Sequence, residues 1–164
     1  MRKLLLLAGL VLTLGACGKD NYATPAPAPA PPTRTQLLTG RNWVLTEATL
    51  NPGITFMGFT FTNGIQALTL TSPCLLDNIQ RFELPNVYTV SEGANVCVGS
   101  PATSTGTWAL SADGNTLTTV LTGVTTTYTV ISVADTELKV SYATTIAFQG
   151  TSQNTTVSAT FTKK

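Results

Sequence analysis

Short runs in which apolar and polar residues alternate recur from residue 42 to the end of the chain. In IQRFEL, residues 79–84, Phe82 and Leu84 share one face while Arg81 and Glu83 share the other. This two-residue period is typical of a β-strand with one buried and one wet face. On this pattern we predict strands at residues 42–50, 55–62, 66–71, 78–84, 87–91, 106–111, 116–121, 125–132, 137–147 and 155–162.

Turn residues separate these runs. Asp113-Gly114 lies between two alternating segments, and this is a strong hairpin signal because glycine accepts a positive φ. Residues 84–87 and 133–136 predict two further hairpin turns. Consecutive hairpins of this kind build an antiparallel meander.

Helical periodicity is limited to a turn at residues 35–39 and a short helix at 73–77. A meander of many strands hides its edge strands by closing on itself. We therefore predict an all-β fold, a small antiparallel up-and-down β-barrel of about 8–10 strands. Closure of such a sheet leaves an interior pocket.

Six aromatic residues fall on the predicted inner faces: Trp43, Phe82, Tyr88, Trp108, Tyr128 and Tyr142. If these rings line a pocket, the barrel binds a small apolar ligand, because ligand pockets are mostly apolar with a few polar groups. If they fill the barrel, the domain is a structural or protein-interaction module. The segment 51–64, with Phe56, Met57, Phe59 and Phe61, predicts either a mobile apolar lip at the barrel mouth or a plain buried strand.

The chain opens with the layout of a secretory signal, residues 1–16. Arg2 and Lys3 form a positive n-region, and residues 4–14 are almost wholly apolar. The apolar stretch is about half of the roughly 20 residues that a membrane-spanning helix needs, so we expect a signal peptide here and no permanent transmembrane helix.

The ending LGAC, residues 14–17, resembles the lipobox of bacterial lipoproteins. The resemblance implies that Cys17 receives a diacylglycerol, that the signal is removed, and that the new N-terminus is acylated, as with palmitate. Two or three acyl chains anchor a protein stably, so the expected partner is a membrane. The expected location is the bacterial cell envelope, at the outer membrane, with the periplasmic and surface faces both open. An ordinary signal peptide with an incidental cysteine is the alternative.

Residues 17–33 form the predicted lipid-anchored linker, and residues 34–164 the barrel domain. Within the linker, ATPAPAPAPPT at 23–33 is mostly Pro and Ala, a composition that favours extended polyproline II and cannot bury a core. At about 3.1 Å per residue, this stretch would hold the domain roughly 30 Å from the membrane. A Pro-rich docking motif for a partner is the alternative.

The composition agrees with a β domain that carries little charge. The chain has 32 threonines and no histidine, and threonine suits a half-wet pleated surface because it is β-branched. Removal of Arg2 and Lys3 leaves seven basic and eight acidic residues. That balance argues against a nucleic-acid partner, which requires a basic patch.

Cys74 and Cys97 are the cysteines that remain beyond the signal. The destination that the signal implies is oxidising, so we predict a structural disulfide between them. A metal site would need more ligands, and a redox pair is usually a close Cys-x-x-Cys. Both alternatives are therefore weaker.

We expect no enzyme activity, no metal and no cofactor. The commonest acid–base group is missing because the chain has no histidine, and neither a serine-nucleophile motif nor a metal-ligand cluster occurs. The carboxylates of the domain fall mostly in turns or on wet faces: Glu47, Asp77, Glu83, Glu92, Asp113, Asp135 and Glu137. A carboxylate pair brought together across the barrel by folding stays open as an alternative.

The order of motifs along the domain resembles the lipocalin-like domains of bacterial lipoproteins, especially those of Bacteroidota. The segments that carry the resemblance are LLTGRNWVLTEA at 37–48, CLLDN at 74–78, YTVSEGANVC at 88–97, TGTWALSADGNTLT at 105–118, YTVISVADTELKVSY at 128–142 and TFTKK at 160–164. The resemblance implies a small antiparallel β-barrel, in agreement with the strand pattern.

Particular positions match the pattern of that family: Gly40 and Trp43 on the first strand, Cys74 and Cys97, and Gly106 and Trp108 on a middle strand. The chain departs from it at two places. The first strand has two residues between its Gly and its Trp instead of one. In true lipocalins an Arg of the last strand packs on that Trp, whereas this chain ends in Lys163 and Lys164.

Overall fold

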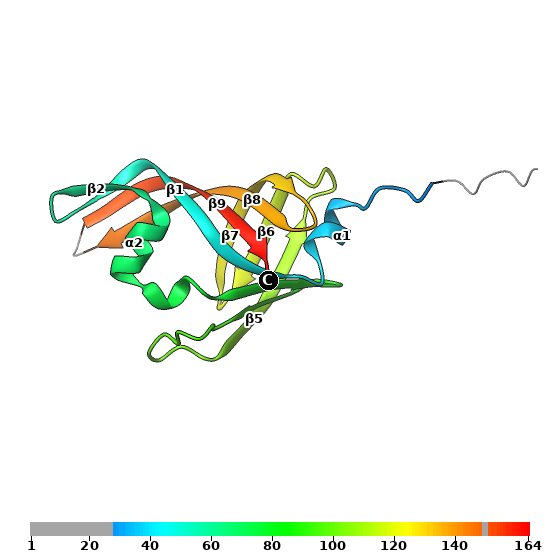
Figure 1. Cartoon of the computed structure of the whole chain (residues 1–164), viewed down its shortest axis with the longest axis horizontal. Coiled ribbons are helices and arrows are strands. Elements are labelled where there is room, and N and C mark those ends of the chain that lie inside the picture. Colours follow the sequence, from blue (N-terminus) through cyan, green and yellow to red (C-terminus); the bar gives the residue numbers. More distant parts are fainter. Residues whose placement is uncertain (1–27, 149–150) are drawn as a thin grey trace, which may run out of the picture. The chain divides into compact units, whose positions relative to one another are not determined.

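The computed structural model describes residues 28–148 and 151–164. The chain divides into two compact units, Met1–Ala30 and Pro31–Lys164. The predicted signal peptide, Cys17 and most of the predicted linker lie outside the described residues. The second unit contains the described elements (Figure 1): α1 (Arg34–Leu38), β1 (Asn42–Phe56), β2 (Phe59–Asn63), α2 (Gly64–Thr71), the 3₁₀ helix η1 (Pro73–Leu75), β3 (Ile79–Glu83), β4 (Val87–Ser91), β5 (Thr103–Leu110), β6 (Thr116–Leu121), β7 (Val124–Val133), β8 (Glu137–Phe148) and β9 (Thr151–Lys163).

The described strands form one antiparallel sheet in the order β2-β1-β3-β4-β5-β6-β7-β8-β9, and β1 also pairs with β9. β1 and β3 to β9 therefore close into an eight-stranded barrel, which confirms the predicted up-and-down, lipocalin-like fold. β2 adds to the far half of β1, where Phe56 pairs with Phe59. The near half of β1 pairs with β3, where Asn42 faces Arg81.

The connections between strands alternate between the two ends of the barrel. One end, here called the closed end, carries α1, the start of β1, the end of β9 and the β3–β4, β5–β6 and β7–β8 turns. The other, the open end, carries the β1–β2 turn, α2, η1 and the β4–β5 loop. Figure 1 shows α1 and α2 at these opposite ends.

The short helix α1 plugs the closed end. Thr33 and Gln36 form a capping box in which Thr33 Oγ1 accepts from the Gln36 amide at 3.2 Å and Gln36 Oε1 accepts from the Thr33 amide at 2.8 Å. Arg34 donates to the carbonyl oxygen of Gly114 at 2.8 Å and so fixes the helix to the β5–β6 turn. The last helical residue, Leu38, is buried inside the barrel.

Most residues that were predicted to face inward do so in the structure, because the side chains of each strand alternate regularly except at bulges. Tyr88, Val140 and Val157 are buried as predicted. β1 keeps its apolar face inward by a bulge between Leu45 and Glu47, which shifts the inward phase by one residue. Inward-facing residues of β1 are therefore Trp43, Leu45, Ala48 and Leu50.

Two predictions near residue 57 are wrong. β1 does not end at residue 50 but runs through Pro52 to Phe56, and the single strand predicted at 55–62 is a hairpin. Met57 and Gly58 form its turn with φ of 48° and 81°. The turn signal in the sequence is weak because methionine, an uncommon residue at positive φ, occupies the first turn position.

The strand predicted at 66–71 is the helix α2. Asn63 caps it, since the Asn63 side chain accepts from the Gln66 amide at 3.1 Å. The apparent alternation in QALTLT is short, and tertiary contacts override it: Gly64 and Ala67 bury against the barrel. The helix predicted at 73–77 is the shorter η1, and the turn at 35–39 is α1.

Leu84, predicted to face inward beside Phe82, is 66% exposed. β3 ends at Glu83, and Leu84 belongs to the turn that leads into β4. A residue past the last ladder pair is no longer held to the alternation of the strand.

Candidate functional site: the cavity in the open half of the barrel

Four of the six predicted interior rings fill the closed half. The Phe82 ring stacks on Tyr88 with centroids 5.0 Å apart and meets Trp108 edge-on at 5.7 Å. Trp108 donates its indole N–H to the carbonyl oxygen of Glu83 at 2.9 Å. Trp43 is fully buried. These rings are core, and none of them lines the cavity described below.

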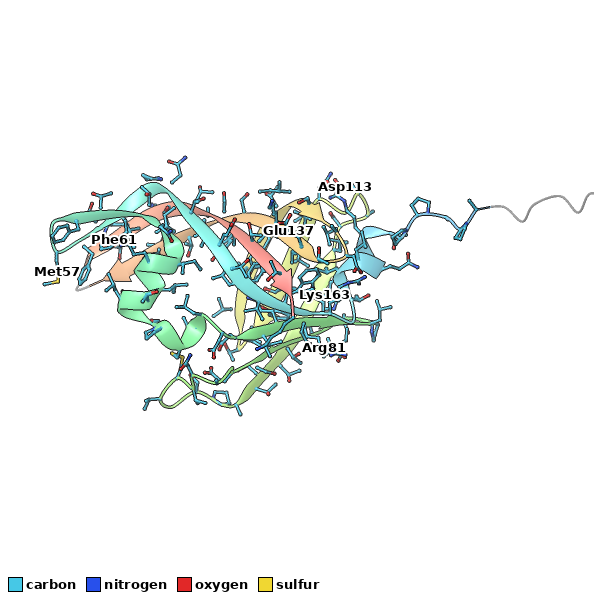
Figure 2. All side chains as sticks on the ribbon, viewed as in Figure 1. Met57, Phe61, Arg81, Asp113, Glu137 and Lys163 are labelled. Atoms are coloured by element: carbon cyan, nitrogen blue, oxygen red, sulfur yellow. A yellow bond between two sulfur atoms is a disulfide. The ribbon has the colours of Figure 1, made fainter. Side chains whose placement is uncertain are left out.

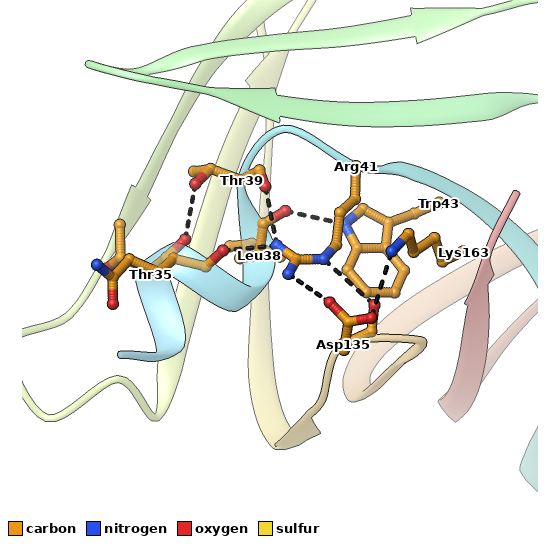
Figure 3. A network of polar contacts seen from close by, with 8 residues as sticks. Thr35, Leu38, Thr39, Arg41, Trp43, Asp135 and Lys163 are labelled. Carbon is orange, nitrogen blue, oxygen red and sulfur yellow. Dashed lines mark hydrogen bonds and ion pairs between the residues drawn. The ribbon is translucent and has the colours of Figure 1, made fainter. Parts of the chain in front are cut away.

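A polar network seals the closed end around Trp43 (Figure 3). The Trp43 indole N–H donates to the carbonyl oxygen of Leu38 at 2.9 Å. Arg41, which precedes β1, pairs with Asp135 at 2.7 Å, and Lys163 of the last strand pairs with the same carboxylate at 3.3 Å. Hydrogen bonds from Arg41 and then from Lys163 lower the pKa of Asp135. The resemblance to lipocalins implies an arginine in the last strand, but this strand carries Lys163. The guanidinium of the network belongs instead to Arg41, which precedes β1.

The open half of the barrel contains a cavity of about 690 Å³. Its wall is mostly aliphatic and aromatic and includes Leu45, Leu50, Ile54, Phe61, Leu68, Val90, Ile146, Val157 and Phe161. Its polar lining consists of uncharged side chains: Thr55, Thr71, Ser72, Asn78, Gln80, Thr144 and Gln153. Among the described residues that line the cavity, none carries a charge. Such a wall suits a neutral, mainly apolar molecule.

Tyr128 and Tyr142 are the predicted interior residues that line the cavity. Their rings meet nearly perpendicular, at 70°, with centroids 5.0 Å apart. Burial raises the pKa of both phenols, and for Tyr128 hydrogen bonds with Thr119 and Thr126 oppose that shift. Both phenols therefore stay protonated at neutral pH and offer O–H groups at the cavity wall.

Asn78 and Gln80 supply the amide groups of the wall. Gln80 Oε1 accepts from the Tyr88 hydroxyl at 2.9 Å, which ties the polar wall to the aromatic core. Asn78 Oδ1 is buried, and within the part of the chain that the structure describes it has no hydrogen-bond partner. A buried acceptor without a donor is costly to the fold.

Helix α2 covers the cavity. Five of its residues line it: Gly64, Ala67, Leu68, Leu70 and Thr71. The helix begins in close contact with β1, since a Cβ at Gly64 would lie 2.7 Å from the Cβ of Ala48. Figure 1 shows α2 beside β1 and β2 at the open end.

The predicted disulfide is confirmed, and it ties this cover to the far wall. Cys74 in η1, just after α2, is joined to Cys97 in the β4–β5 loop. The loop is also held by carboxylates: Asp77 Oδ2 accepts from the Asn95 amide at 3.0 Å, and Glu92 Oε2 accepts from the Cys97 amide at 2.8 Å. Both ends of α2 are thus fixed, one by packing and one covalently.

Of the six aromatic residues predicted to face inward, two line the cavity, so the rest of its wall could not be identified from aromatic residues. Val90, Val157 and Ala159 lie on faces that the strand alternation predicts to point inward. Leu45 and Leu50 are five positions apart and share the inner face because of the bulge after Leu45, which the alternation does not show. Ala67 and Leu68 could not be found from the alternation either, because the segment was predicted as a strand. The predicted lip at 51–64 is the β1–β2 hairpin, and it contributes Phe56 and Phe61 to the wall while Met57 and Phe59 point to solvent.

A comparison of the chain with protein-family models and with curated proteins found no match. The helices that the structure describes include none that is long and apolar enough to cross a bilayer. In residues 28–148 and 151–164, no three His, Cys, Asp or Glu side chains come together as a metal site would require.

Proposed function

We propose that the barrel is a binding module that holds a small, uncharged and largely apolar molecule in its cavity. The observation that carries the proposal is the uncharged cavity of about 690 Å³ under α2, a size that falls within the usual range of small-molecule sites. A filled barrel would serve only as scaffold, whereas here the open half has room for a ligand. The phenols of Tyr128 and Tyr142 and the amide of Asn78 would orient the polar end of the molecule. The proposal includes no catalytic step.

Native mass spectrometry of the protein purified from its own envelope tests this function. We expect a neutral small molecule to co-purify. A bare protein mass, reproduced after incubation with envelope lipid extract, would instead favour the structural or interaction role.

A cavity-filling variant sharpens the test. Ala159 is buried and lines the cavity, so Ala159→Phe places a ring in the ligand space. Titration with the neutral dye N-phenyl-1-naphthylamine should show an affinity loss of about tenfold or more, a difference of about 1.4 kcal/mol. Val90→Phe offers a second filling variant if Ala159→Phe folds poorly. Ala109→Phe, on an exposed position of β5, is the matched control and should bind the dye like the parent chain.

We further propose that Cys17 anchors the protein to the envelope membrane through lipid. The support is the LGAC ending of the signal, residues 14–17, and the Pro- and Ala-rich stretch that follows it. Cys17→Ser should move the protein from the membrane fraction to the soluble fraction. Acyl mass on the N-terminal peptide, retained in the serine variant, would contradict the assignment.

A further inference from the structure

Several large apolar side chains are exposed to solvent at the open end of the barrel. Met57 and Phe59, at the β1–β2 turn, are 73% and 70% exposed. Leu70 of α2 and Leu75 of η1 are also exposed, and so are Val96 and Val98 of the disulfide-linked loop. These six residues are called the apolar rim below. They come from four separate segments that the topology brings to one end.

The segments that build the rim carry almost no charge. No Asp, Glu, Lys or Arg occurs between Glu47 and Asp77 or between Glu92 and Asp113. Asp77 and Glu92 stand at the ends of these uncharged stretches, and the carboxylate of each accepts a hydrogen bond from a backbone amide of the β4–β5 loop. The polar residues of these segments are mostly threonine, serine and asparagine.

The charges of the domain lie toward the opposite end. In the part of the chain that the structure describes, the residues of the closed half include Arg34, Arg41, Arg81, Glu83, Asp113, Asp135, Glu137, Lys139, Lys163 and Lys164. In Figure 2, Met57 and Phe61 lie at one end of the barrel, while Arg81, Asp113, Glu137 and Lys163 lie in the other half. The domain is therefore polarised along its axis. Most of its charges lie in the closed half, whereas the apolar rim at the open end has beside it the carboxylates of Asp77 and Glu92, each bound to a backbone amide.

We infer that the apolar rim docks on a lipid bilayer and inserts Met57 and Phe59 among the acyl chains. An apolar patch that binds a protein is usually accompanied by arginine, which is absent from the segments that build the rim, whereas a surface that enters hydrocarbon keeps its charge to a minimum. The rim also borders the mouth of the cavity, because Leu70 and Leu75 line the cavity as well as the rim. An apolar molecule could thus pass between bilayer and cavity without crossing water.

The length of chain before the barrel allows this orientation. The linker predicted at residues 17–33 can span roughly 50 Å when extended, at about 3.1 Å per residue. β1, the longest described strand, has 15 residues and is at most about 50 Å long. A chain anchored at Cys17 can therefore lay its open end on the same membrane. The docking depends on the proposed anchor only for the choice of membrane, and it does not depend on a ligand in the cavity.

Depth-dependent quenching tests the docking in the full-length chain. Met57→Cys and Phe59→Cys are each labelled with nitrobenzoxadiazole and reconstituted in neutral phosphatidylcholine vesicles, with or without bromine on the acyl chains. We expect blue-shifted emission and loss of fluorescence in brominated lipid. Leu84→Cys is the matched control, because Leu84 is equally apolar and exposed but lies at the closed end. Its label should keep its fluorescence, and the parent chain labelled in parallel gives the background.

A charge-insertion variant provides the second measurement. In a chain labelled at Leu70→Cys, adding Met57→Asp and Phe59→Asp should abolish the quenching, while adding Leu84→Asp should leave it unchanged. Equal fluorescence of the Met57→Cys label in both lipids, or equal quenching at Leu84→Cys, would overturn the docking and direct attention to a protein partner. Dye binding in the cavity, measured separately, distinguishes a failure of docking from a failure of the proposed ligand function.

Discussion

The closed and open halves of the barrel share the same strands, yet one is filled and the other hollow. The difference follows from side-chain size along β1, β3, β4 and β5. Large residues occupy the closed half and smaller ones follow two positions nearer the open end: Trp43 then Leu45, Phe82 then Gln80, Tyr88 then Val90, and Trp108 then Gly106. The smaller residues of these four strands do not fill the barrel, so a cavity remains beyond the rings of Trp43, Phe82, Tyr88 and Trp108.

The two halves also differ in how they are covered. The buried side chain of Leu38, from α1, covers the closed half. The ion pairs of Asp135 with Arg41 and Lys163 lie at the same end of the barrel. Helix α2 covers the open half without filling it, and a disulfide holds this cover in place. One half therefore provides stability, and the other provides space.

Truncation of one aromatic ring in each half should give the largest difference in stability between the two halves. Phe82→Ala removes the ring that contacts both Tyr88 and Trp108 and should lower the free energy of unfolding by about 3–5 kcal/mol. Phe61→Ala enlarges a cavity that already exists and removes a half-buried ring, so we expect a loss of about 1–2 kcal/mol. Urea unfolding followed by tryptophan fluorescence measures both. Equal losses would mean that the open half is packed as tightly as the closed half.

The disulfide should contribute nearly as much to the free energy of unfolding as the Phe82 ring does, although it lies in the open half. Cys74 and Cys97 are 23 positions apart, and the chain-entropy model gives such a loop a stabilisation of about 3 kcal/mol. Cys74→Ser with Cys97→Ser should lower the unfolding free energy by that amount and weaken dye binding, because the cover loses its attachment. An unchanged dye affinity in the double variant would show that packing alone holds α2 over the cavity.

Gly106 tests the boundary between the halves. A Cβ at Gly106 would come within 1.9 Å of the carbonyl oxygen of Val120, so Gly106→Ala must push β5 away from β6. We expect a loss of about 1–3 kcal/mol, as for other cases of overpacking. Thr105→Ala, at an exposed neighbouring position, serves as the control. A neutral Gly106→Ala would show that the two strands separate freely at this height of the barrel.

Low pH should lower the stability of the fold through the ion pairs of the closed end, by less than the substitutions above. The pKa of Asp135 is lowered by hydrogen bonds from Arg41 and Lys163, so its ion pairs stabilise the fold above the pKa of the unfolded chain. This stabilisation is lost as the pH falls through the lower folded pKa. Asp135→Asn should therefore reduce stability at neutral pH and make the remaining stability less sensitive to acid. Urea midpoints at about pH 7 and about pH 3 measure this difference, and identical pH dependence in both chains would contradict it.

The barrel was predictable from sequence because its determinants are local. Period-two alternation and turn residues such as Asp113-Gly114 specify strands and hairpins within a few residues of each other, and most strands pair with their neighbours in sequence. The pairing of β1 with β9 then closes the meander and removes its free edges. The disulfide was predictable because two cysteines allow one pairing. Even the fall in side-chain size from Trp108 to Gly106 is present in the sequence, although its meaning depends on knowing that both residues face inward.

The tertiary structure alone decided how the cavity is covered and which residues line it. The segment 66–71 alternates like a strand, and it became the helix α2 because Gly64 can lie against Ala48 and Asn63 caps the first turn. The split of the six predicted rings into core and cavity wall likewise depends on their height in the barrel, which no local pattern encodes. Alternation tells which face of a strand is inside, but the space inside is set by residues that are distant in sequence and meet only when the barrel closes.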